Sequence, residues 1–93
     1  MVRIIVKFFS LIRHRTGIGQ VEFKASDPKL CAVLSGILHR YAIKDLILTG
    51  SGEIRPWARV LINGRSHDFV GGLDLELHDD DTLALIYPYA DNF

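Results

Sequence analysis

Apolar and polar side chains alternate along the first residues of the chain. Positions 2, 4, 6 and 8 carry Val2, Ile4, Val6 and Phe8, and positions 3, 5, 7 and 9 form a second set. A period of two is typical of a β-strand with one face in a core. Gly17 and Gly19 precede a second alternating run over residues 20–24. The pattern predicts a β-hairpin over residues 2–24 with a wide loop between its strands.

A helical pattern follows the predicted hairpin. Its apolar residues recur at spacings of three and four, at Leu30, Val33, Leu34, Ile37, Leu38 and Tyr41. This spacing places them on one stripe of a helix over about residues 28–42. Ser26 or Asp27 can cap the free amides of the first turn, and Pro28 suits the first helical position. We expect the stripe to pack across the sheet.

Turn-forming residues divide the second half of the chain into strands. A loop at residues 49–52 and Pro56 precede a strand over residues 57–62, which ends at the turn signal Asn63-Gly64. The acidic run 79–81 forms a turn before the last strand, over residues 82–87. The order β-β-α-β-β predicts an α+β fold, with one main helix on a mixed sheet of four to five strands. We expect one domain over residues 1–93, with residues 87–93 as a C-terminal tail.

The alternation also assigns the two faces of this sheet. The expected helix-facing residues are Val2, Ile4, Val6, Val60, Ile62, Leu83 and Leu85. The opposite face then carries apolar residues interleaved with Arg3 and Lys7. An apolar centre with a basic rim is typical of a protein-docking surface. The predicted partner-binding residues are Ile5, Arg59, Leu61, Ala84 and Ile86.

Composition narrows the function classes. A chain of 93 residues with 48% hydrophobic content can bury one core without disulfides or a structural metal. The charges of its 11 basic and 11 acidic residues cancel, so the formal net charge is zero. This balance argues against nucleic-acid or membrane partners. One cysteine, Cys31, fits a reducing compartment, so we expect a cytoplasmic protein in which this thiol is buried and inert. The scattered histidines and the acidic run lack metal-binding spacing, so we expect no metal, cofactor or catalytic residue.

Two blocks of the sequence resemble the MoaD/ThiS family, the small sulfur carriers of molybdopterin and thiamin biosynthesis. The first covers residues 2–17 and ends in Thr16-Gly17, and the second covers residues 60–90. The second block carries Asn63-Gly64-Arg65, Gly71-Gly72-Leu73, Leu77, Asp79, Asp81, Ala84 and Pro88. The resemblance implies a β-grasp, ubiquitin-like fold. It also implies a protein partner at the sheet face, either an adenylating enzyme or the large subunit of molybdopterin synthase.

The resemblance further implies a C-terminal tail that ends in Gly-Gly, whose carboxylate is adenylated and converted to a thiocarboxylate. In this sequence Asp91 and Asn92 occupy the two glycine positions, and Phe93 follows them. Glycine suits such a tail because a narrow channel excludes β-carbons. We therefore expect these three positions to prevent carrier chemistry.

Three functions remain open from the sequence. The first is a non-catalytic binding module related to molybdopterin or sulfur-transfer pathways, with possible self-association. The second is a functional sulfur carrier, as the small subunit of molybdopterin synthase is, or a ubiquitin-like modifier. The third is an accessory subunit of a larger enzyme.

Overall fold

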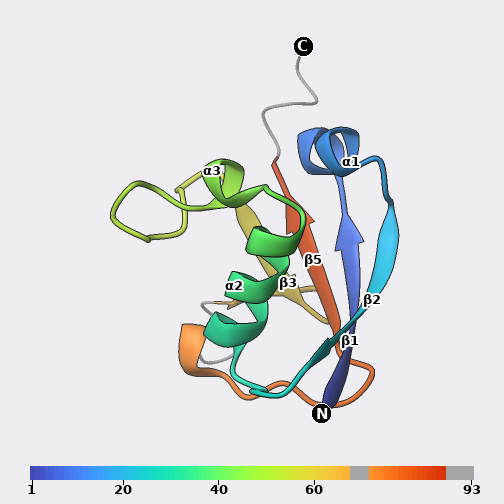
Figure 1. Cartoon of the computed structure of the whole chain (residues 1–93). Coiled ribbons are helices and arrows are strands. Elements are labelled where there is room, and N and C mark those ends of the chain that lie inside the picture. Colours follow the sequence, from blue (N-terminus) through green and yellow to red (C-terminus); the bar gives the residue numbers. More distant parts are fainter. Residues whose placement is uncertain (68–71, 88–93) are drawn as a thin grey trace.

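The computed structural model describes residues 1–67 and 72–87, which form a five-stranded sheet with a helix across one face (Figure 1). The elements in chain order are β1 (Val2–Phe8), α1 (Ser10–Thr16), β2 (Gln20–Ala25), α2 (Leu30–Arg40), α3 (Lys44–Ile47), β3 (Arg59–Ile62), β4 (Arg65–Ser66), η2 (Gly72–Asp74) and β5 (Thr82–Ile86). The strand order is β2-β1-β5-β3-β4. β1 and β5 are parallel, and the other neighbours are antiparallel. This arrangement confirms the predicted α+β, β-grasp fold.

The core lies between α2 and the sheet. The stripe residues Leu30, Val33, Leu34, Ile37 and Leu38 are buried, as are the helix-facing strand residues Ile4, Val6, Phe8, Val60, Ile62, Leu83 and Leu85. All of them belong to one cluster, against which the half-buried Val2 and Tyr41 pack. The assignment of the two sheet faces from the alternation is therefore confirmed.

Two short helices were not predicted. The segment between β1 and β2 is not a wide loop, because it contains α1, which inserts Ile12 into the core and ends at Gly17 in the left-handed conformation (φ 73°). α3 similarly buries Leu46 and Ile47. Each helix is too short to show a helical period in the sequence, and each is held by the apolar side chains that it buries.

The predicted bounds of two elements need correction. α2 spans Leu30–Arg40 rather than about residues 28–42, and its N-cap residue, Lys29, makes no side-chain capping bond. Asp27 instead accepts a hydrogen bond from the backbone N–H of Lys29, at 3.0 Å, just before the helix. The third strand begins at Arg59 rather than at residue 57.

Cys31 is exposed, which corrects the expectation of a buried thiol. It lies in the first turn of α2, about 100° around the axis from Leu30. Cys31 shares its side of the helix with the exposed Ser35, four residues later. The margin of the apolar stripe therefore faces solvent at this end of the helix.

Candidate protein-docking face

The sheet has an open face, defined here as the strand side chains that point away from α2. The register sets Lys7 beside Ala84, and Ala84 beside Leu61, so β1, β5 and β3 contribute neighbouring residues to one row. Arg59 is paired with Ile86 in the same way. Since residues two apart in a strand share a face, Ile5 joins the same surface. The structure thus brings all five predicted partner-binding residues together.

The apolar centre of the open face is only partly exposed. Ile5, Leu61, Ala84 and Ile86 are half-buried, because neighbouring side chains on the sheet cover part of each one. Arg59 is exposed at the rim, and its Nη1 donates to the backbone carbonyl of Pro56 at 3.3 Å. The helices α1, α2 and α3 instead bury side chains such as Ile12, Ile37 and Ile47 in the core, on the other side of the sheet. A partner would remove the remaining apolar area from water.

Phe9 extends this apolar centre and was missing from the predicted set. It follows β1 in extended conformation (φ −127°, ψ 159°), and its N–H donates to the carbonyl of Leu85 at 3.1 Å. The alternation of β1 therefore continues through Phe9 and places it on the open face at the level of Ile86. Its side chain is 40% exposed, which is high for a phenylalanine. The same alternation in the sequence is the signal that identifies it.

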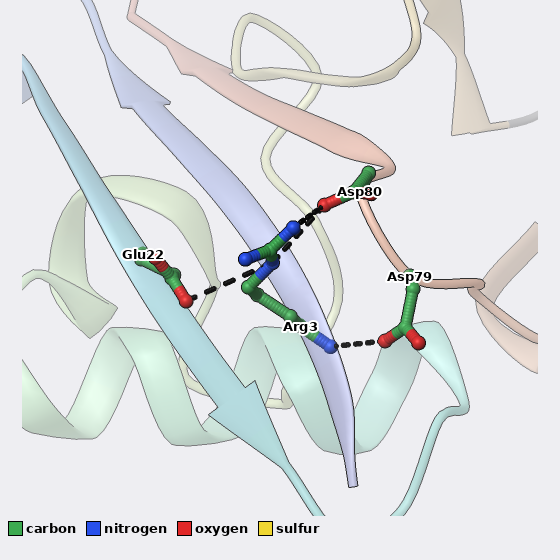
Figure 2. Close-up of polar contacts among 4 residues, drawn as sticks. All are labelled: Arg3, Glu22, Asp79 and Asp80. Atoms are coloured by element: carbon green, nitrogen blue, oxygen red, sulfur yellow. Dashed lines mark hydrogen bonds and ion pairs between the residues drawn. The ribbon is translucent and has the colours of Figure 1, made fainter.

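Arg3 does not contribute a free charge to the basic rim. Its guanidinium forms an ion pair with Asp80, including a hydrogen bond from Nε at 3.0 Å, and its Nε lies 3.7 Å from Oε1 of Glu22 (Figure 2). The hydrogen bond and the charge of Asp80, followed by the charge of Glu22, raise the pKa of Arg3 above its usual value. The backbone N–H of Arg3 also donates to Asp79 at 2.8 Å. Arg3 therefore joins β1 to the acidic turn.

Lys7 and Arg59 are the cations that lie directly beside the apolar centre of the open face. Neither forms an ion pair with a carboxylate of residues 1–67 or 72–87. Lys7 is half-buried beside Ala84, and Arg59 lies beside Ile86. The unpaired cations thus flank the apolar centre, which fits a partner surface that is apolar in the middle and acidic at its edge.

The acidic run 79–81 is a structural turn. Asp81 accepts hydrogen bonds from Nδ2 of Asn63 at 3.0 Å and from the backbone N–H of His78 at 2.8 Å. Oδ1 of Asn63 in turn accepts from the N–H of Thr82 at 2.9 Å. Within the described part of the chain, no three His, Cys, Asp or Glu residues form a group that could hold a metal ion. The motif residues Asn63, Asp79 and Asp81 thus fix the connection into β5.

Asp91, Asn92 and Phe93 lie outside the described residues, so the structure does not place the predicted tail positions. None of the helices in residues 1–67 and 72–87 is long and apolar enough to cross a membrane.

Comparison with known proteins places the fold among small β-grasp proteins. No protein-family model and no curated protein matches the chain. Among solved structures, it is similar to the small archaeal modifier protein SAMP1 from Haloferax volcanii, with a TM-score of 0.81, 22% identity, and coverage of 92% of this chain and 94% of SAMP1.

Two further solved structures are similar to the chain. A putative molybdopterin converting factor subunit 1 from Pyrococcus furiosus has a TM-score of 0.73 and 20% identity, with 95% of this chain and 99% of that chain covered. A chain of the BexX/CysO complex from Amycolatopsis orientalis has a TM-score of 0.73 and 25% identity, with 90% and 93% covered. These neighbours are ubiquitin-like β-grasp proteins, which confirms the predicted resemblance to proteins of the MoaD/ThiS type.

Proposed function

We propose that this chain is a cytoplasmic, non-catalytic binding module of the MoaD/ThiS type that docks a protein partner on its open face. The observation that carries the proposal is the half-buried apolar centre around Leu61 and Ile86, on the side of the sheet away from the core, beside the unpaired cations Lys7 and Arg59. Burying such a centre is favourable because apolar area leaves water. The flanking cations would orient an acidic rim on the partner.

The partner class follows from the resemblance and from one solved structure. The resemblance implies an adenylating enzyme or the large subunit of molybdopterin synthase. A similar chain was solved as part of the BexX/CysO complex, so a protein of this fold occurs bound to another protein. We propose that this chain acts in a molybdopterin or sulfur-transfer pathway through a contact of this kind, with no nucleic acid or membrane as a partner.

The tail positions support a binding role rather than a carrier role. Asp91 and Asn92 stand where the family carries two glycines, and Phe93 adds a ring. A tail that enters a narrow channel has no space for these side chains. The carboxylate of Asp91 also places a negative charge near the group that must meet ATP. Both effects oppose adenylation of the C-terminus.

A functional sulfur carrier or ubiquitin-like modifier is the second candidate. It is favoured by the names of the similar structures, which include a small archaeal modifier protein and a putative molybdopterin converting factor subunit. The intact mass after co-expression with a family adenylating enzyme and a sulfur source separates the two candidates. A carrier gains the mass difference between sulfur and oxygen, whereas we expect the mass of this chain to stay unchanged.

The docking face itself is tested by calorimetric titration of the chain into a family adenylating enzyme. Leu61→Asp places a charge at the apolar centre and should weaken binding by about 30-fold or more, the effect of losing one hot-spot residue. Ser35→Asp is the matched control, because Ser35 is exposed on α2, on the other side of the sheet. Equal binding by wild type and Leu61→Asp would contradict the proposed face. No binding by any variant would favour the accessory-subunit function, with a different enzyme as partner.

A further inference from the structure

β2 forms one edge of the sheet, and its outer side carries unpaired backbone groups. In the strand order it pairs only with β1, and no described element lies beyond it (Figure 1). It is six residues long and has no proline or glycine. An edge of this kind can accept a further strand through its free N–H and C=O groups.

The hydrogen bonds of β1 identify which groups of β2 point outward. Phe8 donates to the carbonyl of Gly19, whereas Ile5 donates to Asp81 on the β5 side. The backbone N–H and C=O groups of even-numbered β1 residues therefore point toward β2, and the register pairs Ile4 with Phe23. The backbone groups of β2 that point toward β1 belong to Val21, Phe23 and Ala25. Those that point away from the sheet then belong to Gln20, Glu22 and Lys24.

The charges of β2 are complementary to those of an antiparallel copy of the same strand. Glu22 and Lys24 are exposed on the open-face side and lie on either side of Phe23. When two copies pair about Phe23, each Glu22 lies opposite Lys24 of the second copy. Pairing about Glu22 would instead oppose two glutamates, which is unfavourable. The charge pattern thus selects one register.

Lys24 has no carboxylate partner within the chain that would compete with this pairing. Its neighbour on β1 is Arg3, a like charge, and it forms no ion pair with any residue of 1–67 or 72–87. Oε1 of Glu22 lies 3.7 Å from Nε of Arg3. In the dimer, Glu22 would lie between this Arg3 and Lys24 of the second copy. A second copy therefore supplies the opposite charge that Lys24 lacks.

The helix-side residues of β2 fit the same register. Val21, Phe23 and Ala25 are half-buried at the margin of the core, where the ring of Phe23 lies against Gly36 of α2. Pairing about Phe23 places the two Phe23 rings together and each Val21 opposite Ala25 of the second copy. Aromatic and aliphatic cross-strand pairs stabilise a sheet. Backbone groups, charges and apolar residues therefore agree on one arrangement.

We propose that this chain self-associates through antiparallel pairing of β2 with β2 of a second copy, centred on Phe23. The outward groups of Glu22 exchange hydrogen bonds with those of Lys24 of the second copy, and Phe23 faces Phe23 across a non-hydrogen-bonded pair. The two sheets become continuous, and both open faces stay accessible. Self-association and docking on the open face are therefore separable.

Disulfide trapping tests the register directly. In a Cys31→Ser background, which removes the exposed native thiol, Phe23→Cys should form a covalent dimer under mild oxidation, because Cα atoms of a non-hydrogen-bonded pair lie about 4.5 Å apart. Val21→Cys and Ala25→Cys should each form no disulfide-linked dimer alone and should cross-link when mixed. The mixture keeps Phe23 in place, so it remains informative if Phe23→Cys unfolds. No cross-linking in the mixture, or equal cross-linking of Val21→Cys alone, would overturn the proposal.

Charge reversal tests the same contact at equilibrium. In sedimentation of the wild-type chain over a concentration series we expect a monomer–dimer equilibrium, and a monomer at all concentrations would overturn the proposal. Glu22→Lys and Lys24→Glu should each weaken the dimer by about tenfold, and the double reversal should restore it. Gln20→Lys adds one positive charge to the same strand outside the Glu22–Lys24 pairs and should leave the dimer unchanged. Leu61→Asp should also dimerise normally, so failure of one proposal does not imply failure of the other.

Discussion

Gly36 permits a close contact between α2 and β2, and filling it is the most informative stability test. A β-carbon built on Gly36 would lie 2.9 Å from Cζ of Phe23 and 3.5 Å from its Cε2. Normal carbon contacts are about 3.5–4.0 Å, so the ring would have to move. Phe23 is held between α2 and the edge of the core, and a rigid ring has few ways to yield. Gly36→Ala should therefore destabilise the protein.

Two opposing terms set the size of this effect. Alanine in a helix interior is favoured over glycine by about 0.8–1.0 kcal/mol. Overpacking of a well-packed site costs about 1–3 kcal/mol. The net expectation is a loss of about 0–2 kcal/mol, whereas helix propensity alone predicts a gain of about 1 kcal/mol. The sign of the change in the free energy of unfolding thus shows whether the Phe23 ring stays in place or moves to accommodate the new methyl group.

Urea unfolding of a double-mutant cycle measures the contact. Phe23→Leu removes the atoms that the new methyl group would meet, so Gly36→Ala in that background should recover the helix gain of about 1 kcal/mol. The two substitutions should then couple favourably, with equal m-values in all four proteins. A stabilising Gly36→Ala in the wild-type background, with no coupling to Phe23→Leu, would refute the close packing of α2 on β2.

Other substitutions test the core and the acidic turn, each followed by urea unfolding. Leu38→Ala removes a side chain that is 2% exposed and should cost about 2–5 kcal/mol, so an unchanged midpoint would show that Leu38 is not core. Asp81→Ala removes the acceptor of the Asn63 amide and of the His78 N–H, both of which are exposed to water, and should cost about 0.5–1.5 kcal/mol. Asp80→Asn removes only an exposed ion pair with Arg3 and should leave the midpoint unchanged. A loss as large as that of Asp81→Ala would contradict this difference between the two aspartates.

The elements with long regular patterns could be predicted from the sequence. The alternation in β1 and the stripe on α2 each extend over enough residues to assign buried and open faces, as the burial of Val6 and Ile37 confirms. α1 and α3 could not be predicted in this way. Their few residues show no period, and they fold because Ile12 and Leu46 reach a core that is built by distant strands.

The residues of the open face could be predicted from the sequence, but which of its cations are paired could not. Period two places Ile5 and Leu61 on the open face without knowledge of the strand order. The neutralisation of Arg3 depends on Asp80, 77 residues away in the chain, so no local pattern reveals it. Of the predicted rim residues Arg3, Lys7 and Arg59, Lys7 and Arg59 therefore remain without an ion pair to any carboxylate of residues 1–67 or 72–87.

A competition measurement tests the proposed function most directly. A variant with Asp91→Gly and Asn92→Gly and without Phe93 should support pyrophosphate exchange by a family adenylating enzyme with labelled ATP. We expect the wild-type chain to support no exchange and to inhibit that of the variant, because it occupies the same docking site through its open face. Leu61→Asp should not inhibit. Exchange by the wild-type chain itself would show a functional carrier, and equal inhibition by wild type and Leu61→Asp would show that the open face is not the docking surface.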